Sequence, residues 1–445
     1  MAEIKKRPPK NPLLPREPID SVTRPLTEFL QIQASSGIVL LLTTAAAIYL
    51  ANSRWAEGFA EFWHTSVGVS WGTRQLELSL LHWINDGLMV IFFFVVGLEV
   101  KRELVHGELR EFRKAALPIA GALGGMVVPA AVYLTLQLGE PGQAGWGVPM
   151  ATDIAFVVGC LALFGSRIPR GLRVMMLTLA IVDDIGAILV IAIGYTHDLN
   201  MVALLLACGM IVVVLLAGRL GIRSIPIYVA LGVAMWYFFH ESGVHATIGG
   251  VILGIMTPAK PYLDEGPLAA LVQRIGEVLR GESEPLADRF TEVQYLREAA
   301  RETVPPAEFL ENVLHPWVAF GVMPLFALAN AGVAVSLEEL RSPVAVAVVA
   351  GLVLGKPLGI VTVCWLSVRA GLAHLPLGVS WANIVGGGCL AGIGFTMSLF
   401  LANLALDESL LAPAKIGVLA ATAASAVLGM ALLALSCRAA DGNIR

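Results

Sequence analysis

The stretch VMMLTLAIVDDIGAILVIAIG, residues 174–194, decides how this chain is interpreted. Two aspartates, Asp183 and Asp184, stand side by side in its middle, and the stretch carries no other charged residue. An ionised side chain at the centre of a bilayer costs about 2.5–3.5 kcal/mol on insertion scales, so two in succession indicate a functional site. The alternative, a charged cap on a core helix of a soluble protein, requires the composition of a soluble protein.

The composition is instead that of an integral membrane protein. Of the 445 residues, 57% are hydrophobic and only 14% are charged, against roughly 25% charged in soluble domains. The net charge of −4 predicts no nucleic-acid partner. The five cysteines lie in or beside apolar stretches without metal-ligand spacing, so they are interpreted as small apolar residues.

Twelve stretches have the apolar length, about 20 residues, that a hydrocarbon core of about 30 Å demands of a helix. They are predicted at 33–52, 83–101, 115–137, 148–165, 172–194, 200–217, 224–240, 244–258, 313–334, 342–368, 378–403 and 412–436. The predicted fold is therefore an all-α membrane protein with twelve transmembrane helices.

The distribution of basic residues predicts the orientation in the membrane, because Lys and Arg near helix ends stay cytoplasmic. With twelve spans both termini share a side, and that side holds 25 of the 30 Lys and Arg residues. We expect a cytoplasmic tail at 1–32, a transmembrane domain at 33–436 and a second cytoplasmic tail at 437–445. Residues 1–32 lack the features of a cleaved signal peptide.

Two polar segments interrupt the predicted membrane domain. Residues 259–312 form the longest one, a cytoplasmic connector whose part 267–280 has the apolar spacing of a surface amphipathic helix. Residues 52–82 form an extracytoplasmic loop, in which apolar side chains alternate on both sides of Gly72-Thr73-Arg74-Gln75. This pattern favours a β-hairpin at 67–80 whose open edges invite a homodimer, although a loop lying on the membrane surface explains it equally.

The fourth and eleventh spans carry signs of a broken helix. The segment GWGVPMATDIAFVVG (145–159) is short and polar, and we expect its helix to break near Thr152 and Asp153. Unpaired backbone groups at that depth mark an ion or substrate site. The late counterpart is IVGGGCLAGIGFTMSLF (384–400), where the glycines crowd the middle of the span: Gly386, Gly387, Gly388, Gly392 and Gly394. Close helix packing is the alternative explanation for these glycines.

Two broken spans indicate a transporter with inverted-topology repeats and discontinuous crossing helices at spans 4 and 11. Where such helices cross, ends of like partial charge meet, and a side chain of opposite charge should neutralise them. Asp153 could compensate the positive ends and Lys356, in the middle of its span, the negative ones. The alternative for Lys356 is a structural residue whose ammonium reaches the interface.

Successive helical residues point about 100° apart, so one carboxylate of Asp183 and Asp184 can hold Lys356 while the other faces a cavity. Such a set of two acids and an ammonium titrates as a unit. Na⁺ or Li⁺, as a hard cation, prefers oxygen ligands and would compete with protons for the same carboxylates. Competition for one site is sufficient for exchange of Na⁺ against H⁺.

The chain resembles the NhaA-type Na⁺/H⁺ antiporter family over seven segments between residues 80 and 398. They are LLHWINDGLMVIFFFVVGLEVKREL (80–104), ATDIAF (151–156), LAIVDDIGAI (179–188), SGVHATIGGV (242–251), VLHPWVAF with PLFALANAGV (313–333), GKPLGI (355–360) and GIGFTMS (392–398). The resemblance implies an inverted-repeat bundle of twelve helices and electrogenic exchange of two protons for one Na⁺ or Li⁺. It implies no cofactor and a place in the bacterial inner membrane.

The resemblance also implies roles for single residues. Asp184 matches the principal cation and proton carboxylate, with Asp183 beside it. Thr152 and Asp153 match the pair at the unwound helix, and Lys356 the membrane-embedded lysine.

Further matching positions imply a cytoplasmic funnel and a response to pH. Asp86, Glu99 and Glu103 match the funnel, while His245, Glu311 and His315 match the pH response. Glu99 and Glu103 are four apart and share a helix face, whereas Lys101 and Arg102 are expected to turn elsewhere. A solvated charge cluster at the helix end is the alternative for the two glutamates. Asn312 stands where the family often has a histidine, so one titrating group is absent.

Two other classes of function compete with the antiporter. A Na⁺-coupled symporter of an organic solute has a similar architecture but needs a larger, substrate-reading cavity. An intramembrane aspartyl protease also uses two acids, but here the acids are adjacent, and the Gly-x-Gly-Asp pattern of such enzymes is missing. The sequence therefore favours a transporter over an enzyme.

Overall fold

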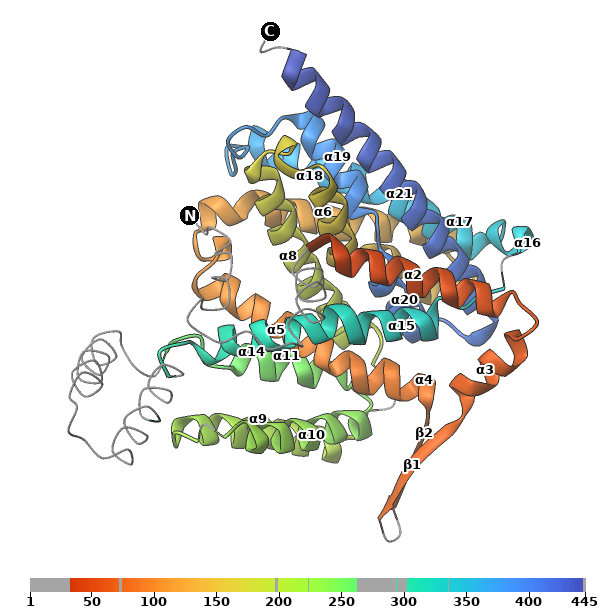
Figure 1. Cartoon of the computed structure of the whole chain (residues 1–445), viewed down its shortest axis with the longest axis vertical. Coiled ribbons are helices and arrows are strands. Elements are labelled where there is room, and N and C mark those ends of the chain that lie inside the picture. Colours follow the sequence, from red (N-terminus) through yellow and green to blue (C-terminus); the bar gives the residue numbers. More distant parts are fainter. Residues whose placement is uncertain are drawn as a thin grey trace, which may run out of the picture.

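The computed structural model describes residues 33–71, 74–196, 199–222, 224–261, 294, 302–334 and 336–442. Across these ranges the chain is a bundle of helices with one two-stranded sheet at its edge (Figure 1). The predicted all-α membrane class is confirmed. The predicted tail 1–32, most of the connector 259–312 with its segment 267–280, and residues 443–445 lie outside the described residues.

Within the described ranges, seven helical segments are long and apolar enough to cross a membrane. They are Leu80–Val105, Arg113–Gln137, Arg170–Gly194, Met201–Arg219, Pro306–Asn330, Pro343–Arg369 and Glu408–Cys437. Three bent pairs of helices raise the number of candidate spans to ten when each pair counts as one. The protein is therefore a multi-pass membrane protein.

The predicted number of twelve spans is larger than the seven to ten candidate spans found among the described residues. Each predicted stretch coincides with a helix, but α10 (Ile225–Ser242) and α11 (Thr247–Met256) are not among the ten candidates. α11 has ten residues, which rise only about 15 Å against the 30 Å of a hydrocarbon core. The count of twelve stays a prediction.

The fourth predicted span consists of two half-helices separated by Ala151–Asp153, which are not helical. The first half is a 3₁₀-helix (η3, Pro141–Met150), the second is α7 (Ile154–Leu163), and their axes differ by 43°. The eleventh span divides in the same way into α19 (Trp381–Ala391) and α20 (Phe395–Ala405), with a bend of 46°.

The two interruptions meet each other in space. The amide of Asp153 donates a hydrogen bond of 2.7 Å to the carbonyl oxygen of Ile393. Each interruption thus supplies a backbone partner for the other, as a break at membrane depth requires.

The prediction that five glycines interrupt the eleventh span is wrong for three of them. Gly386, Gly387 and Gly388 lie inside α19, where they are buried. A Cβ atom on Gly386 would come within 2.8 Å of Leu433, and one on Gly387 within 2.8 Å of Met176. These glycines allow close helix packing, and only Gly392 and Gly394 border the interruption.

The segment after the first span bends sharply and leads into the sheet. α2 (Gln33–Ala51) and α3 (Ala56–His64) meet at 112°. β1 (Ser66–Trp71) then pairs antiparallel with β2 (Arg74–Ser79), and the ribbon projects away from the bundle in Figure 1. Two residues join the strands, so Arg74 and Gln75, which the sequence analysis assigned to the turn, belong to β2.

The helices that carry the candidate site cross in the middle of the bundle. α6 (Phe112–Gln137) packs along α18 (Lys356–Arg369) and also packs against α8 (Arg170–Gly194). α18 reaches α8 through the side chain of Lys356. α6 and α18 touch at Gly124 and Gly359, where a Cβ atom on either glycine would clash with the other's carbonyl oxygen. A π-helical stretch, Ala350–Gly355, directly precedes Lys356, and such stretches are frequent at functional sites.

The remaining helices surround this crossing. Their bounds are Met89–Val105 for α5, which follows the π-helical turn Trp83–Leu88, Met201–Arg219 for α9, Pro306–Trp317 for α14, Met323–Asn330 for α15, Leu337–Leu340 for α16, Pro343–Val349 for α17 and Glu408–Gly442 for α21. α14 begins at Pro306. Residues 306–312, assigned to the polar connector, therefore belong to a membrane-length helix.

Candidate ion-binding site

Asp183 is the centre of a buried polar cluster. Its Oδ2 atom lies 2.6 Å from the Nζ atom of Lys356 and 2.6 Å from the hydroxyl of Thr152. The side chains of Asp183 and Lys356 are fully buried. Two helices, α8 and α18, and the non-helical interruption at 151–153 thus meet at one carboxylate oxygen.

The other oxygens of the aspartate pair lack donors. Asp183 Oδ1 is buried without a hydrogen-bond partner. Asp184 is 3% exposed, and within the part of the chain that the structure describes no donor bonds its carboxylate. Asp184 is subject to the fields of Asp183, Glu99 and Asp153, and of one cation, Lys356. Three carboxylate oxygens are therefore available to a cation or a proton.

The donors of this cluster also serve the carboxyl ends of the half-helices. Lys356 Nζ donates to the carbonyl oxygen of Met150, the last residue of η3. The Thr152 hydroxyl lies 2.9 Å from the carbonyl oxygen of Ala391, the last residue of α19. These carbonyls are the negative ends of the helix dipoles, so the ammonium lies where negative partial charge collects.

Asp153 serves the opposite ends. Its Oδ1 accepts the amide of Phe156 at 3.2 Å, which caps α7. Its Oδ2 accepts the amide of Thr396 at 3.2 Å and also the Thr396 hydroxyl. One carboxylate thus caps the amino ends of both α7 and α20, where positive partial charge collects.

A second charged cluster lies near the carboxyl end of α5. Arg102 forms ion pairs with Glu311 of α14 and, at 3.7 Å, with Glu103. The expectation that Arg102 turns away from the glutamates is wrong, because its long side chain reaches an acid on another helix. Glu99 is half-buried one turn earlier, and His315, on the same helix as Glu311, is exposed.

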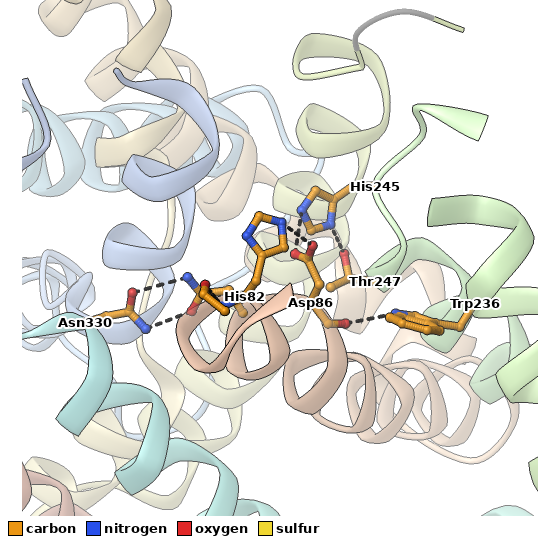
Figure 2. A network of polar contacts seen from close by, with 8 residues as sticks. His82, Asp86, Trp236, His245, Thr247 and Asn330 are labelled. Carbon is orange, nitrogen blue, oxygen red and sulfur yellow. Dashed lines mark hydrogen bonds and ion pairs between the residues drawn. The ribbon is translucent and has the colours of Figure 1, made fainter. Parts of the chain in front are cut away.

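A third cluster lies at the other end of the same helix, beside the hairpin (Figure 2). The Asp86 carboxylate lies 3.3 Å from His82 Nε2 and 3.6 Å from His245 Nε2. His245 also contacts the Thr247 hydroxyl at 2.8 Å, and the Trp236 indole donates to the backbone carbonyl of Asp86.

This arrangement corrects the single funnel that the sequence analysis predicted. Asp86 and Glu99 are 13 residues apart, which corresponds to about 20 Å along a helix. Asp86 lies with His245, and Glu103 lies with Glu311, at opposite ends of α5. The predicted funnel and pH residues therefore fall into two separate groups, Asp86 with His245 at one end and Glu103 with Glu311 at the other.

Three amide side chains complete the network in Figure 2. Asn330 donates to Asn85 at 2.8 Å and accepts from Asn403 at 2.8 Å, and it is fully buried. The chain of amides links α15, the turn before α5 and α20. The sequence analysis assigned no role to these residues or to His82 and Thr396. Asn330 could have been predicted as a polar contact of the core, because it is an amide within the apolar stretch PLFALANAGV.

The described parts of the chain contain no group of three or more His, Cys, Asp or Glu side chains arranged to hold a resident metal ion. The carboxylates of Asp183 and Asp184 match the oxygen donors that a hard monovalent cation prefers.

Comparison with known proteins identifies the family. The model of the Na⁺/H⁺ antiporter 1 family matches residues 27–433. The chain belongs to this antiporter family. The Na⁺/H⁺ antiporter NhaA of Rhodopirellula baltica is 53% identical over 421 residues, 94% of this chain and 96% of that protein. NhaA of Rhizobium meliloti is 51% identical over 95% of this chain and 97% of its own length. NhaA 2 of Acidiphilium cryptum is 49% identical over 98% and 97%.

Membership of the antiporter family makes the chain a transporter rather than an enzyme. The resemblance drawn from the seven segments is confirmed, since the match extends across nearly the whole membrane domain. Family membership does not by itself assign a role to any single residue.

The pairing of Lys356 with Asp183 can be tested by stability. Lys356→Met leaves a buried carboxylate without its cation, and removing one partner of a buried pair costs about 3–5 kcal/mol. We expect a clearly lower melting temperature in detergent, and partial recovery in Lys356→Met/Asp183→Asn. Lys114→Met, which removes an exposed ion pair with Glu111, is the control and should change little. Equal melting of Lys356→Met and wild type would contradict the pairing.

Proposed function

We propose that this chain is an electrogenic Na⁺/H⁺ antiporter that moves about two protons inward for each Na⁺ or Li⁺ outward. Both cations bind in turn at Asp183 and Asp184. The observation that carries this proposal is the set of buried carboxylate oxygens without donors, Asp183 Oδ1 and the Asp184 carboxylate, next to the buried Lys356.

Competition at one site is the physical basis of the exchange. A protonated carboxylate offers a cation only a weak neutral ligand, whereas the ionised form attracts it strongly in a buried site. Na⁺ and protons therefore exclude each other from Asp184. If only loaded states change their exposure between the two sides, exclusive occupancy produces obligatory exchange.

The charges of the cluster account for the proposed electrogenicity. Two ionised aspartates and one ammonium carry one net negative charge, which a bound Na⁺ neutralises. Two bound protons instead leave one net positive charge. The two halves of the cycle thus differ by one charge, and the membrane potential drives the proton-loaded half at about 2.3 kcal/mol per 100 mV.

The interrupted spans hold the site at the middle of the membrane in this proposal. η3 with α7 and α19 with α20 are the two discontinuous crossing helices of an inverted-repeat bundle with twelve spans. Both termini face the cytoplasm of a bacterial cell, and the sheet faces the other side of its inner membrane. The excess of basic residues on one side supports this orientation.

The two outer clusters then have distinct places. The group of Arg102, Glu103 and Glu311 lies near the cytoplasmic mouth, with Glu99 between it and Asp184. Asp86 and His245 lie toward the sheet. We assign Glu311, His315 and His245 to the response to pH, and Asn312 removes one titrating group from it.

Asp184→Asn should abolish Na⁺-dependent proton movement in proteoliposomes, because an amide cannot exchange a proton for Na⁺. The control is Asp407→Asn, at an exposed aspartate before α21, which should keep wild-type exchange. Exchange retained in Asp184→Asn would remove this carboxylate from the mechanism. If wild-type protein moves Na⁺ only when an organic solute is added, the symporter alternative holds instead.

The apparent KM for Na⁺ should fall as the pH rises across the neutral range. At higher pH fewer carboxylates carry a proton, so more sites accept Na⁺. Where one proton competes, linkage predicts a change of about tenfold per pH unit. Na⁺-dependent exchange measured at a series of pH values provides the test. A KM independent of pH would contradict a shared site.

We further propose that two copies of the chain pair through the sheet of β1 and β2, because a two-stranded sheet leaves both edges open to another chain. Replacement of residues 66–79 by a short Gly-Ser linker should convert the dimer into a monomer in detergent solution. The exchange activity of the monomer should persist, since the candidate site lies within one chain. Light scattering coupled to size exclusion distinguishes the two, and an unchanged dimer would contradict this interface.

A further inference from the structure

The half-helix that leads to Thr152 and Asp153 has an unusual conformation. η3 is a 3₁₀-helix of ten residues, Pro141–Met150, whereas runs longer than three or four residues are uncommon because their hydrogen bonds are poorer. At about 2.0 Å per residue it extends about 20 Å, against about 15 Å for an α-helix of equal length. Groups outside the segment must therefore help to hold it.

Two tyrosine hydroxyls bond the backbone of this segment between Gly142 and Gly147. Tyr133 of α6 is fully buried, and its Oη donates to the carbonyl oxygen of Gly142 at 2.7 Å. Tyr195, directly after α8, donates to the carbonyl oxygen of Ala144 at 3.0 Å. The same hydroxyl accepts the amide of Gly147 at 3.0 Å. The hydroxyls thus hold η3 to the two helices that flank it.

The sequence of the segment makes room for these hydroxyls. A Cβ atom on Gly147 would lie 2.6 Å from Tyr195 Oη, and one on Gly145 would overlap Tyr133 Oη. Any larger residue at either position displaces the hydroxyl from the backbone. The two glycines and the two tyrosines therefore form matched pairs.

The far end of the same segment contacts the candidate ion site. The carbonyl oxygen of Met150 accepts from Lys356, and that of Val148 accepts from Ser398 at 2.8 Å. Thr152 follows two residues later and bonds Asp183. A shift of η3 along its axis therefore moves the Thr152 hydroxyl and the Met150 carbonyl relative to the Asp183–Lys356 pair.

We propose that Tyr133 and Tyr195 are positioning residues that hold η3 through their hydroxyls and thereby set the affinity of the site for Na⁺. The inference rests on the proposed function, since it assigns residues to that same site. Neither hydroxyl bonds Asp183, Asp184 or Lys356. Both act through the backbone of η3, which ends beside Thr152.

The test uses Tyr195→Phe and Tyr133→Phe in reconstituted full-length protein. Loss of the hydroxyl, which removes one hydrogen bond in Tyr133→Phe and two in Tyr195→Phe, should raise the KM for Na⁺ about 3- to 10-fold while the maximal rate stays within about twofold. The control is Tyr228→Phe, which also removes a hydroxyl bonded to a backbone carbonyl, that of Ile222 beyond α9. It should leave the KM unchanged.

A second-site experiment separates positioning from general damage. Gly147→Ala should raise the KM more than Tyr195→Phe does, because the added methyl displaces the hydroxyl. In Gly147→Ala/Tyr195→Phe the obstructing oxygen is gone, so the KM should return to near the value of Tyr195→Phe alone. A double variant worse than both single variants would overturn the matched pairing.

Na⁺-dependent thermal stabilisation in detergent serves as a second readout that needs no transport. Each tyrosine variant should require about 3- to 10-fold more Na⁺ for half of the wild-type stabilisation. A lower melting temperature with unchanged KM and unchanged Na⁺ dependence would show that the hydroxyls stabilise the fold only, and would overturn the inference. Absence of exchange in the wild type would instead overturn the proposed function.

Discussion

Backbone groups at membrane depth must find partners within the protein, and this constraint governs the centre of the molecule. Two interrupted helices leave amides at the start of α7 and α20 and carbonyls at the end of η3 and α19 without helical partners. Asp153 accepts the amides of Phe156 and Thr396, while Lys356 donates to the carbonyl of Met150. Asp153 thus serves the amino ends of both second halves, whereas Lys356 serves the carboxyl end of η3 and the Thr152 hydroxyl lies at that of α19.

The same constraint divides the work between the neighbouring aspartates. Lys356 and Thr152 both bond Oδ2 of Asp183, so one oxygen of that residue is committed to the scaffold. The carboxylate of Asp184 has no such commitment in the described structure. Removal of the ammonium would unbalance the helix end and the acid together, so Lys356 stabilises both.

Charges in apolar stretches were the part of the site that the sequence could predict. Asp153, Asp183, Asp184 and Lys356 are isolated in their spans, and the cost of burying charge makes such positions informative. The sequence analysis expected one aspartate to hold the lysine but could not decide which one. That choice depends on how α18 crosses α8, a packing relation between residues 173 positions apart.

Other features escaped because they depend on partners distant in the sequence. Spacing along one helix placed Arg102 away from the glutamates, but its partner Glu311 comes from a helix 209 residues later. The glycines 386–388 could break a helix or allow packing, and only their neighbours Leu433 and Met176 decide between the two. The sequence analysis did not single out Tyr133 and Tyr195, since nothing local shows where a hydroxyl bonds.

The amides of Asn85, Asn330 and Asn403 differ in kind from the charged centre. A neutral hydrogen bond contributes about 0.5–1.5 kcal/mol net, whereas a hydrogen bond to a charged group contributes about 1.5–3 kcal/mol. α20 is thus tied tightly on its Asp153 side and loosely on its Asn403 side. In mechanical terms, α20 is stiffly anchored near its amino end and weakly anchored near its carboxyl end. A strain on the bundle would therefore displace the carboxyl end of α20 first.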